Sequence, residues 1–276
     1  MSDIVVREDL SRRDPRERIS KSFLQTVEAC GQKAWRSIHD PVPWTAPEKV
    51  TFGSAVDAGL EVIVKALARD EEPDLLAAHH QAMLRVDAEE NLPDEGEVLV
   101  ALKSFADWSV VHEVHWPGTI TQPHLRLELP GIGEVDAHPD IILPSPTIVD
   151  AKTTPGNRMT KVAATSYTEL GLYALLYEAA TGERVRTVAY WQYLRGLKKP
   201  EWRESVAQVT DRMLETSRAR VAAVARAIEA DSLLNDGVAV PVNSVFTSPP
   251  RYGCDGCQYR PTCDWAEEEF ADAAAA

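Results

Sequence analysis

Apolar residues recur at two different spacings along the chain. Up to about residue 116 they return every three or four positions, which is the period of an amphipathic helix. This period predicts helices over 20–38, 51–69, 72–91 and 94–116. Later runs alternate or are rich in β-branched and aromatic residues, which predicts strands over 124–129, 185–194 and 202–209. The helical period returns over 167–181 and 210–230.

One stretch, GEVDAHPDIILPSPTIVDAKTT over 133–154, contains two short apolar runs on either side of Pro144-Ser145-Pro146. Because prolines cannot continue a ladder, this spacing predicts an antiparallel hairpin. A three-residue turn places Asp140 opposite Asp150, and opposed Cβ atoms lie about 4.5 to 5.5 Å apart. Lys152 follows Asp150 by two positions and therefore shares its face of the strand. The hairpin predicts two carboxylates and one amine at a single point.

Carboxylate oxygens are the ligands that Mg²⁺ and Mn²⁺ prefer. A divalent ion between the two acids would relieve their repulsion and activate a water for attack on a phosphodiester, with the lysine holding the water or a phosphate oxygen. A surface hairpin with solvated charges is the alternative interpretation.

These residues resemble the core of the PD-(D/E)XK nucleases, in the RecB-like and CRISPR-associated iron-sulfur exonuclease branch. The similar segments are Ala137-His138-Pro139-Asp140 and the run from Ile148 to Thr153, IVDAKT. The resemblance implies an α/β fold with a restriction-endonuclease-like core, in which a mixed central β-sheet carries flanking helices. An N-terminal helical region and a C-terminal cysteine-rich staple complete the expected architecture.

The resemblance also implies residue roles. Asp140 and Asp150 would be ligands of Mg²⁺ or Mn²⁺, Lys152 the catalytic lysine, and the carbonyl of Ala151 a further ligand. Asp136 lies in Gly133-Glu134-Val135-Asp136, which also fits the family's G-x-x-D pattern, and is the alternative first ligand. The register of the hairpin favours Asp140.

Two further motifs fit the family with one change each. A G-x-x-x-H motif supplies a metal-binding histidine on a helix, and here Gly53 is followed by Asp57, which can bind the same ions through oxygen. A Q-x-x-x-Y motif follows the lysine strand, and here Glu169 and Tyr173 take its places on one helix face. Asp57 as an exposed acid and Tyr173 as a packing residue are the alternatives.

Four cysteines, at positions 30, 254, 257 and 263, are all that the chain contains. Four thiolates can hold a structural zinc or a 4Fe-4S cluster, whereas the two-residue spacer between Cys254 and Cys257 disfavours a disulfide. One N-terminal cysteine, Cys30, with a C-terminal C-x2-C-x5-C resembles the AddB and CRISPR-associated nucleases. That resemblance implies a 4Fe-4S cluster that joins the two ends of the chain, with zinc as the alternative.

Composition sets the domain organisation that we expect. The 276 residues, of which 44% are hydrophobic, can form one sizeable core. We expect a flexible lead over 1–18 and one nuclease domain over 19–270, with a helical part at about 20–116, a nuclease core at about 120–231 and an iron-sulfur tail at 250–265. Since no membrane-length apolar run or signal peptide is present, we expect a cytoplasmic protein without membrane contact.

A net charge of −14 disfavours a broad non-specific DNA surface. A narrow basic channel remains compatible with it. Arg158 and Lys161 follow the hairpin, and Arg195 and Lys198 lie in the turn between the last two strands. We predict that these four residues contact DNA, with solvated turns as the alternative.

The resemblance implies a metal-dependent DNA exonuclease that acts on single-stranded DNA or duplex ends. Recombination, repair, phage replication or CRISPR spacer acquisition would be its setting, and proteins of those processes its partners. Two alternatives stay open. The chain could be a catalytically weakened DNA-binding or scaffolding subunit, or a zinc-stapled interaction module of a recombination machine.

Overall fold

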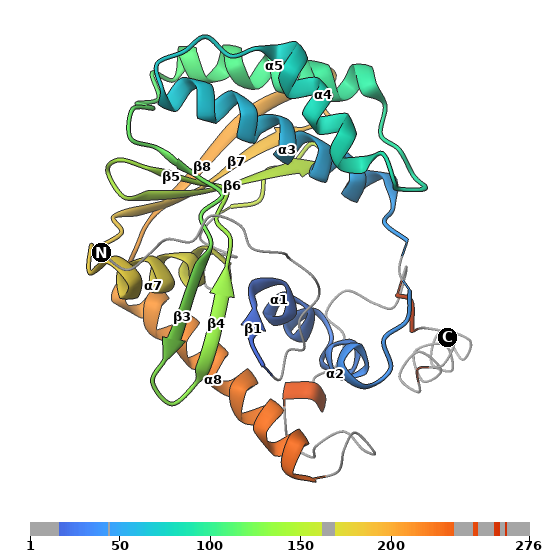
Figure 1. The fold of residues 1–276 in the computed structure, drawn as a ribbon, viewed down its shortest axis with the longest axis vertical. Coiled ribbons are helices and arrows are strands. Elements are labelled where there is room, and N and C mark those ends of the chain that lie inside the picture. Colours follow the sequence, from blue (N-terminus) through green and yellow to red (C-terminus); the bar gives the residue numbers. More distant parts are fainter. Residues whose placement is uncertain are drawn as a thin grey trace. The chain divides into compact units, whose positions relative to one another are not determined.

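A computed structural model describes residues 17–43, 45–161, 169–234, 245–247, 257–259 and 263 (Figure 1). These residues form two compact units: the first contains 45–125 and 137–217, and the second contains the rest. Most of the expected lead, residues 1–16, lies outside the described chain. The predicted single domain stays a prediction.

The first unit is built on a five-stranded sheet with the order β2-β5-β6-β7-β8. Its strands are β2 (Ile120–Thr121), β5 (Ile141–Leu143), β6 (Thr147–Thr154), β7 (Thr187–Leu194) and β8 (Glu201–Gln208). β6 pairs with β5 in the antiparallel sense and with β7 in the parallel sense, so the sheet is mixed. This confirms the predicted mixed α/β fold.

The hairpin has the predicted register. Ile141 pairs with Val149 and Leu143 with Thr147. The turn at 144–146 therefore fixes the face on which each β6 side chain points, because a one-residue slip would invert them all. Asp150 and Lys152 share one face of β6 as a result.

Helices cover both faces of this sheet (Figure 1). On one face lie α3 (Glu48–Ala68), α4 (Leu75–Val86) and α5 (Glu95–Val111), and on the other lies α7 (Glu169–Thr181). The first face carries an aromatic core around Phe105, whose ring lies 5.1 to 6.2 Å from those of four tryptophans: Trp108, Trp116, Trp191 and Trp202. α7 is buried throughout Glu169–Tyr177, so it forms an inner layer rather than an amphipathic surface helix.

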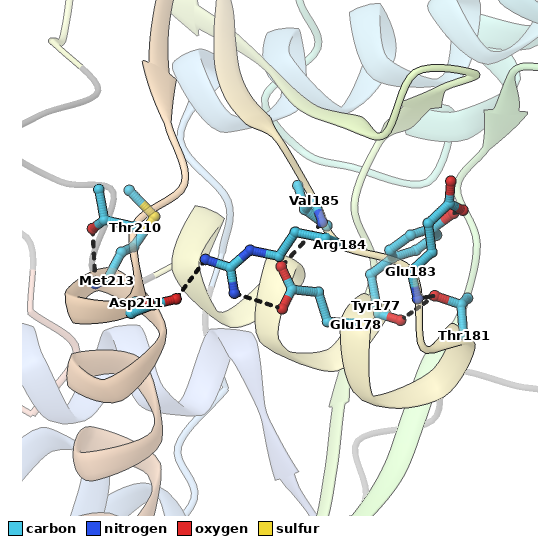
Figure 2. A network of polar contacts seen from close by, with 9 residues as sticks. All are labelled: Tyr177, Glu178, Thr181, Glu183, Arg184, Val185, Thr210, Asp211 and Met213. Atoms are coloured by element: carbon cyan, nitrogen blue, oxygen red, sulfur yellow. Dashed lines mark hydrogen bonds and ion pairs between the residues drawn. The ribbon is translucent and has the colours of Figure 1, made fainter.

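Polar contacts fix the end of α7 relative to the strands that follow (Figure 2). Glu178 accepts the backbone N–H of Val185 at 3.0 Å, and its carboxylate also binds Arg184 at 3.2 Å. Arg184 reaches Asp211 at 2.6 Å, in the first turn of α8 (Asp211–Leu234). The connection from α7 into β7 is thereby tied to the helix after β8.

The second unit contains α1 (Lys21–Ala29), α2 (Gly31–His39) and the 3₁₀ turn η1 (Val245–Thr247). A three-stranded sheet has the order β1-β4-β3, from β1 (Ile19–Ser20), β4 (Gly133–Ala137) and β3 (Leu125–Leu129). The single helix predicted over 20–38 was wrong at one point. Cys30 has extended angles (φ −163°, ψ 113°), so it ends α1 and its sulfur caps α2 by accepting the N–H of Lys33. Ser20 caps α1, since its side chain accepts the N–H of Phe23.

The other predicted elements form with shifted ends. α4 and α5 stop before the predicted ends at 91 and 116, and the strand predicted from 124 begins at Leu125. The start predicted for α7, at 167, lies outside the described residues. Among the described helices, none combines the length and apolarity that a membrane span requires.

Candidate active site

A glycine lets α3 approach the strand that carries the D-x-K motif. A Cβ added at Gly53 would lie 3.1 Å from the hydroxyl oxygen of Thr153, so a larger residue would require the Thr153 side chain or α3 to shift by a few tenths of an ångström. Asp57 lies one turn further along α3 and faces the same way as Gly53. The glycine of the G-x-x-x-D motif therefore has a packing reason.

Three carboxylates lie close together at the open end of the hairpin. Burial raises the pKa of Asp140 well above its usual range, and the charges of Asp150 and then Asp57 raise it further. Lys152 and the backbone N–H of Ala151 lower the pKa of Asp140. The Ala151 N–H donates a hydrogen bond to the Asp140 carboxylate at 2.7 Å. Asp57, Asp140 and Asp150 thus share one electrostatic environment.

A small pocket opens beside these acids. Asp57, Asp140 and Ala151 line it together with Glu61, Thr121 and Gln122. These residues offer oxygen ligands from carboxylates and amide groups, which is the donor set of Mg²⁺ or Mn²⁺ rather than of a soft metal. Burial and then the neighbouring charges of Asp150 and Asp57 disfavour a charged Asp140, and a bound cation would offset that cost. A divalent cation therefore fits the site both chemically and electrostatically.

Lys152 is held between two carboxylates. Its amine lies 2.5 Å from Asp150 and 3.4 Å from Glu169. Burial by itself would lower the pKa of Lys152, but Asp150, Glu169 and Asp140 raise it well above its ordinary value. The lysine is therefore a cation, suited to binding a phosphate oxygen and unsuited to acting as a base.

Glu169 and Tyr173, which the sequence places on one helix face, both contact this group. The Tyr173 hydroxyl donates to Asp150 at 3.2 Å, and burial followed by the charge of Asp150 raises the pKa of Tyr173. Sequence reasoning missed Tyr190, whose hydroxyl donates to Glu169 at 2.6 Å. The pairing of β6 with β7 would have identified Tyr190, because Tyr190 lies beside Asp150 in the parallel ladder between these strands.

The alternative ligand Asp136 has a different environment. It lies on β4 in the second unit, where Arg18 approaches it at 3.3 Å. Its carboxylate is 3% exposed, and the guanidinium compensates its charge. The contacts of Asp140 with Ala151, Asp150 and Asp57 thus favour Asp140 as the first acid of the motif.

The four predicted DNA contacts differ in their surroundings. Arg158, Lys161 and Lys198 are exposed. Arg195 instead binds Glu48 at 3.0 Å and Glu97 at 2.6 Å, and its guanidinium lies 3.9 Å from the centre of the Phe52 ring. Because two carboxylates neutralise Arg195, it is the least suited of the four to bind a phosphate.

The described cysteines gather in the second unit, while Cys254 lies outside the described residues. Burial raises the pKa of Cys30, and Cys257 and Cys263 raise it further. An N-terminal and a C-terminal segment of this unit are in contact, since the Arg36 guanidinium lies 5.8 Å from the centre of the Tyr259 ring. A Cβ at Gly31 would lie 2.7 Å from the carbonyl oxygen of Phe246, so this close approach of backbone requires glycine.

Comparison with known proteins gives a family and three distant structures. The model of the PD-(D/E)XK nuclease superfamily matches residues 18–264. No curated protein matches the chain.

Solved structures with some similarity include a candidate exonuclease from Eubacterium rectale, 16% identical, covering 78% of this chain and 80% of its own, with a TM-score of 0.45. The structure of SSO0001 is 11% identical, and the match covers 89% of this chain and 96% of that chain with a TM-score of 0.35. The structure of LHK-Exo in complex with dAMP is 13% identical, and the match covers 64% of this chain and 92% of that chain with a TM-score of 0.32. These similarities are too distant to support an argument about activity.

Proposed function

The chain belongs to the PD-(D/E)XK nuclease superfamily, and we propose that it is a metal-dependent DNA exonuclease acting on single-stranded DNA or duplex ends. The observation that carries this proposal is the environment of Asp140. It is a carboxyl group crowded by Asp150 and Asp57, beside a lysine that two carboxylates keep protonated.

Asp57, Asp140, Asp150 and the carbonyl of Ala151 would hold Mg²⁺ or Mn²⁺. When bound, the ion supplies positive charge that offsets the carboxylates and the charge developing on the phosphate. Lys152 adds a second positive charge from the β6 strand and binds a non-bridging phosphate oxygen. The amine of Lys152 is held in place by Asp150 and Glu169, so little reorganisation of this charge is needed when substrate binds.

The other polar residues position this pair of charges. Tyr173 donates to Asp150 and fixes the carboxylate that contacts Lys152. Tyr190 donates to Glu169 and leaves the second oxygen of that carboxylate directed at the amine. In this proposal, glutamate in place of the family's glutamine strengthens the hold on Lys152, because an ionic contact replaces a neutral one.

We also propose that Cys30, Cys254, Cys257 and Cys263 bind a 4Fe-4S cluster that joins the chain's ends. The effect of Cys257 and Cys263 on the pKa of Cys30 supports a shared ligand. A site of this kind closes a very long loop, so its removal should loosen the second unit. Iron and acid-labile sulfide in anaerobically purified protein would support the cluster, whereas zinc without iron would support the alternative.

Linear and circular single-stranded DNA of the same sequence test the proposed activity. An exonuclease requires an end, so in Mn²⁺ the protein should degrade the linear substrate to mononucleotides or short products and leave the circle intact. Equal cutting of both would make it an endonuclease. If neither is cut although both bind, the departures at Asp57 and Glu169 would mark a DNA-binding subunit with a weakened site.

A further inference from the structure

Gln192 is a buried residue on β7 to which the site gives no role so far. Its side chain is 0% exposed, and both ends of its amide bind a single loop residue, Thr160. The Gln192 oxygen accepts the backbone N–H of Thr160 at 2.8 Å, and its nitrogen donates to the Thr160 carbonyl at 2.8 Å. One side chain therefore satisfies the backbone of the loop as a neighbouring strand would.

The position of Gln192 places that loop beside the catalytic lysine. Gln192 pairs with Lys152 in the parallel ladder between β6 and β7, so the two side chains project from the same face of the sheet. Tyr190, two residues earlier on this face, contacts Glu169, which in turn contacts Lys152. Thr160 is consequently held on the face that carries the proposed chemistry.

A second anchor holds the start of the loop. The backbone N–H of Gly196 donates to the Gly156 carbonyl at 3.2 Å, and that of Arg195 donates to the Thr154 carbonyl at 2.9 Å. A Cβ at Gly196 would lie 2.7 Å from the Pro155 carbonyl oxygen, so only glycine allows this approach. The loop over 155–160 is fixed at both ends, and its exposed residues include Arg158, with Lys161 directly after it.

We propose that Gln192 is a positioning residue that holds the loop over 155–161 against the sheet, so that Arg158 and Lys161 bind the DNA backbone beside the phosphate at Lys152. This inference rests on the proposed nuclease function. Gln192 itself does not touch the substrate. It acts by ordering the loop before binding, which removes an entropic cost that the substrate would otherwise have to overcome.

The test compares Gln192→Leu with Gln208→Leu, a matched change at an exposed position at the end of β8. Binding of a fluorescein-labelled single-stranded oligonucleotide is measured by anisotropy in Ca²⁺, and cleavage is measured in Mn²⁺. We expect Kd and KM to rise about tenfold in Gln192→Leu, the equivalent of one or two lost hydrogen bonds. The kcat at saturating DNA should stay within about twofold, and Gln208→Leu should match the wild type. Gly196→Ala, which displaces the loop from its other end, should reproduce the rise in Kd.

A mutant cycle that combines Gln192→Leu with Arg158→Ala/Lys161→Ala distinguishes loss of loop positioning from general damage to the fold. In that background Gln192→Leu should change Kd less than about twofold, because the charges that it positions are already gone. An unchanged Kd in Gln192→Leu, or an undiminished effect in the charge-deleted background, would overturn the inference. Wild-type protein that binds DNA without cutting it would refute the nuclease proposal alone, whereas absence of DNA binding would refute both.

Discussion

Replacing Asp140 by asparagine should stabilise the protein when divalent ions are absent. The change keeps an oxygen that can accept the Ala151 N–H but removes a charge that Asp150 and Asp57 oppose. At about 5 Å and an effective dielectric constant of about 20, each like-charge pair costs about 3 kcal/mol. Two repulsions against one attraction of similar size from Lys152 leave about 3 kcal/mol of expected stabilisation as an upper estimate.

The size of this stabilisation depends on pH. Because the pKa of Asp140 is raised in the folded protein, the folded state binds its proton more tightly than the unfolded state does. The free energy of unfolding therefore falls as pH rises from the ordinary carboxyl pKa through the raised value. The advantage of asparagine should be absent in acid and should grow as pH rises through that window, so the melting temperatures are compared over a pH series.

Thermal unfolding in EDTA tests the repulsion among the acids, and thermal unfolding in Mn²⁺ tests whether Asp140 binds the ion. In EDTA the melting temperature of Asp140→Asn should exceed that of the wild type by about 2 to 4 °C per kcal/mol. In Mn²⁺ the difference should largely disappear, because an ion at about 100 times its Kd stabilises the wild type by about 2.7 kcal/mol. Asp107→Asn, on the exposed face of α5, is the matched control.

Two results would refute the reasoning. If Asp140→Asn melts below the wild type in EDTA, repulsion among the three acids is not the dominant effect at this position. If Mn²⁺ raises the melting temperatures of both proteins equally, Asp140 is not a ligand of the ion.

Three further predictions concern single residues. Lys152→Met should lower the rate of single-turnover cleavage by about 10²- to 10³-fold, because a preorganised positive charge is lost. Stabilisation of the protein by Mn²⁺ should persist in this variant. Loss of that stabilisation would show damage to the metal site instead. Phe105→Ala should cost about 3 to 5 kcal/mol in urea unfolding, since the ring fills a core among four tryptophans, and a cost below about 1 kcal/mol would contradict this packing. Cys257→Ser should abolish bound iron and acid-labile sulfide, and unchanged iron content would exclude Cys257 as a ligand.

The sequence predicted the hairpin well because its information is local. Prolines at 144 and 146 limit the turn, and the two apolar runs allow one register, so the relation of Asp140 to Asp150 and Lys152 follows from the residues themselves. The spacing of Glu169 and Tyr173 was equally readable, because four residues along a helix restore the same face.

Tertiary contacts decided what the sequence could not predict. The break between α1 and α2 at Cys30 has no proline to signal it, and the close approach of η1 to Gly31 appears only in three dimensions. The strand β4 joins a different sheet from the hairpin that follows it, although both lie within one short stretch. The pairing of Gln192 with a loop 32 residues away in the chain has no periodic signature either.

The central claim is that the acids at 140 and 150 and the amine at 152 form a metal-dependent hydrolytic site. The most direct measurement is cleavage of an end-labelled oligonucleotide by dialysed wild type, Asp150→Asn and the control Asp107→Asn, with Mn²⁺ or with EDTA. We predict cleavage by wild type and Asp107→Asn in Mn²⁺ alone, and cleavage slower by about 10²-fold or more in Asp150→Asn. Equal rates for wild type and Asp150→Asn, or cleavage that persists in EDTA, would contradict the account.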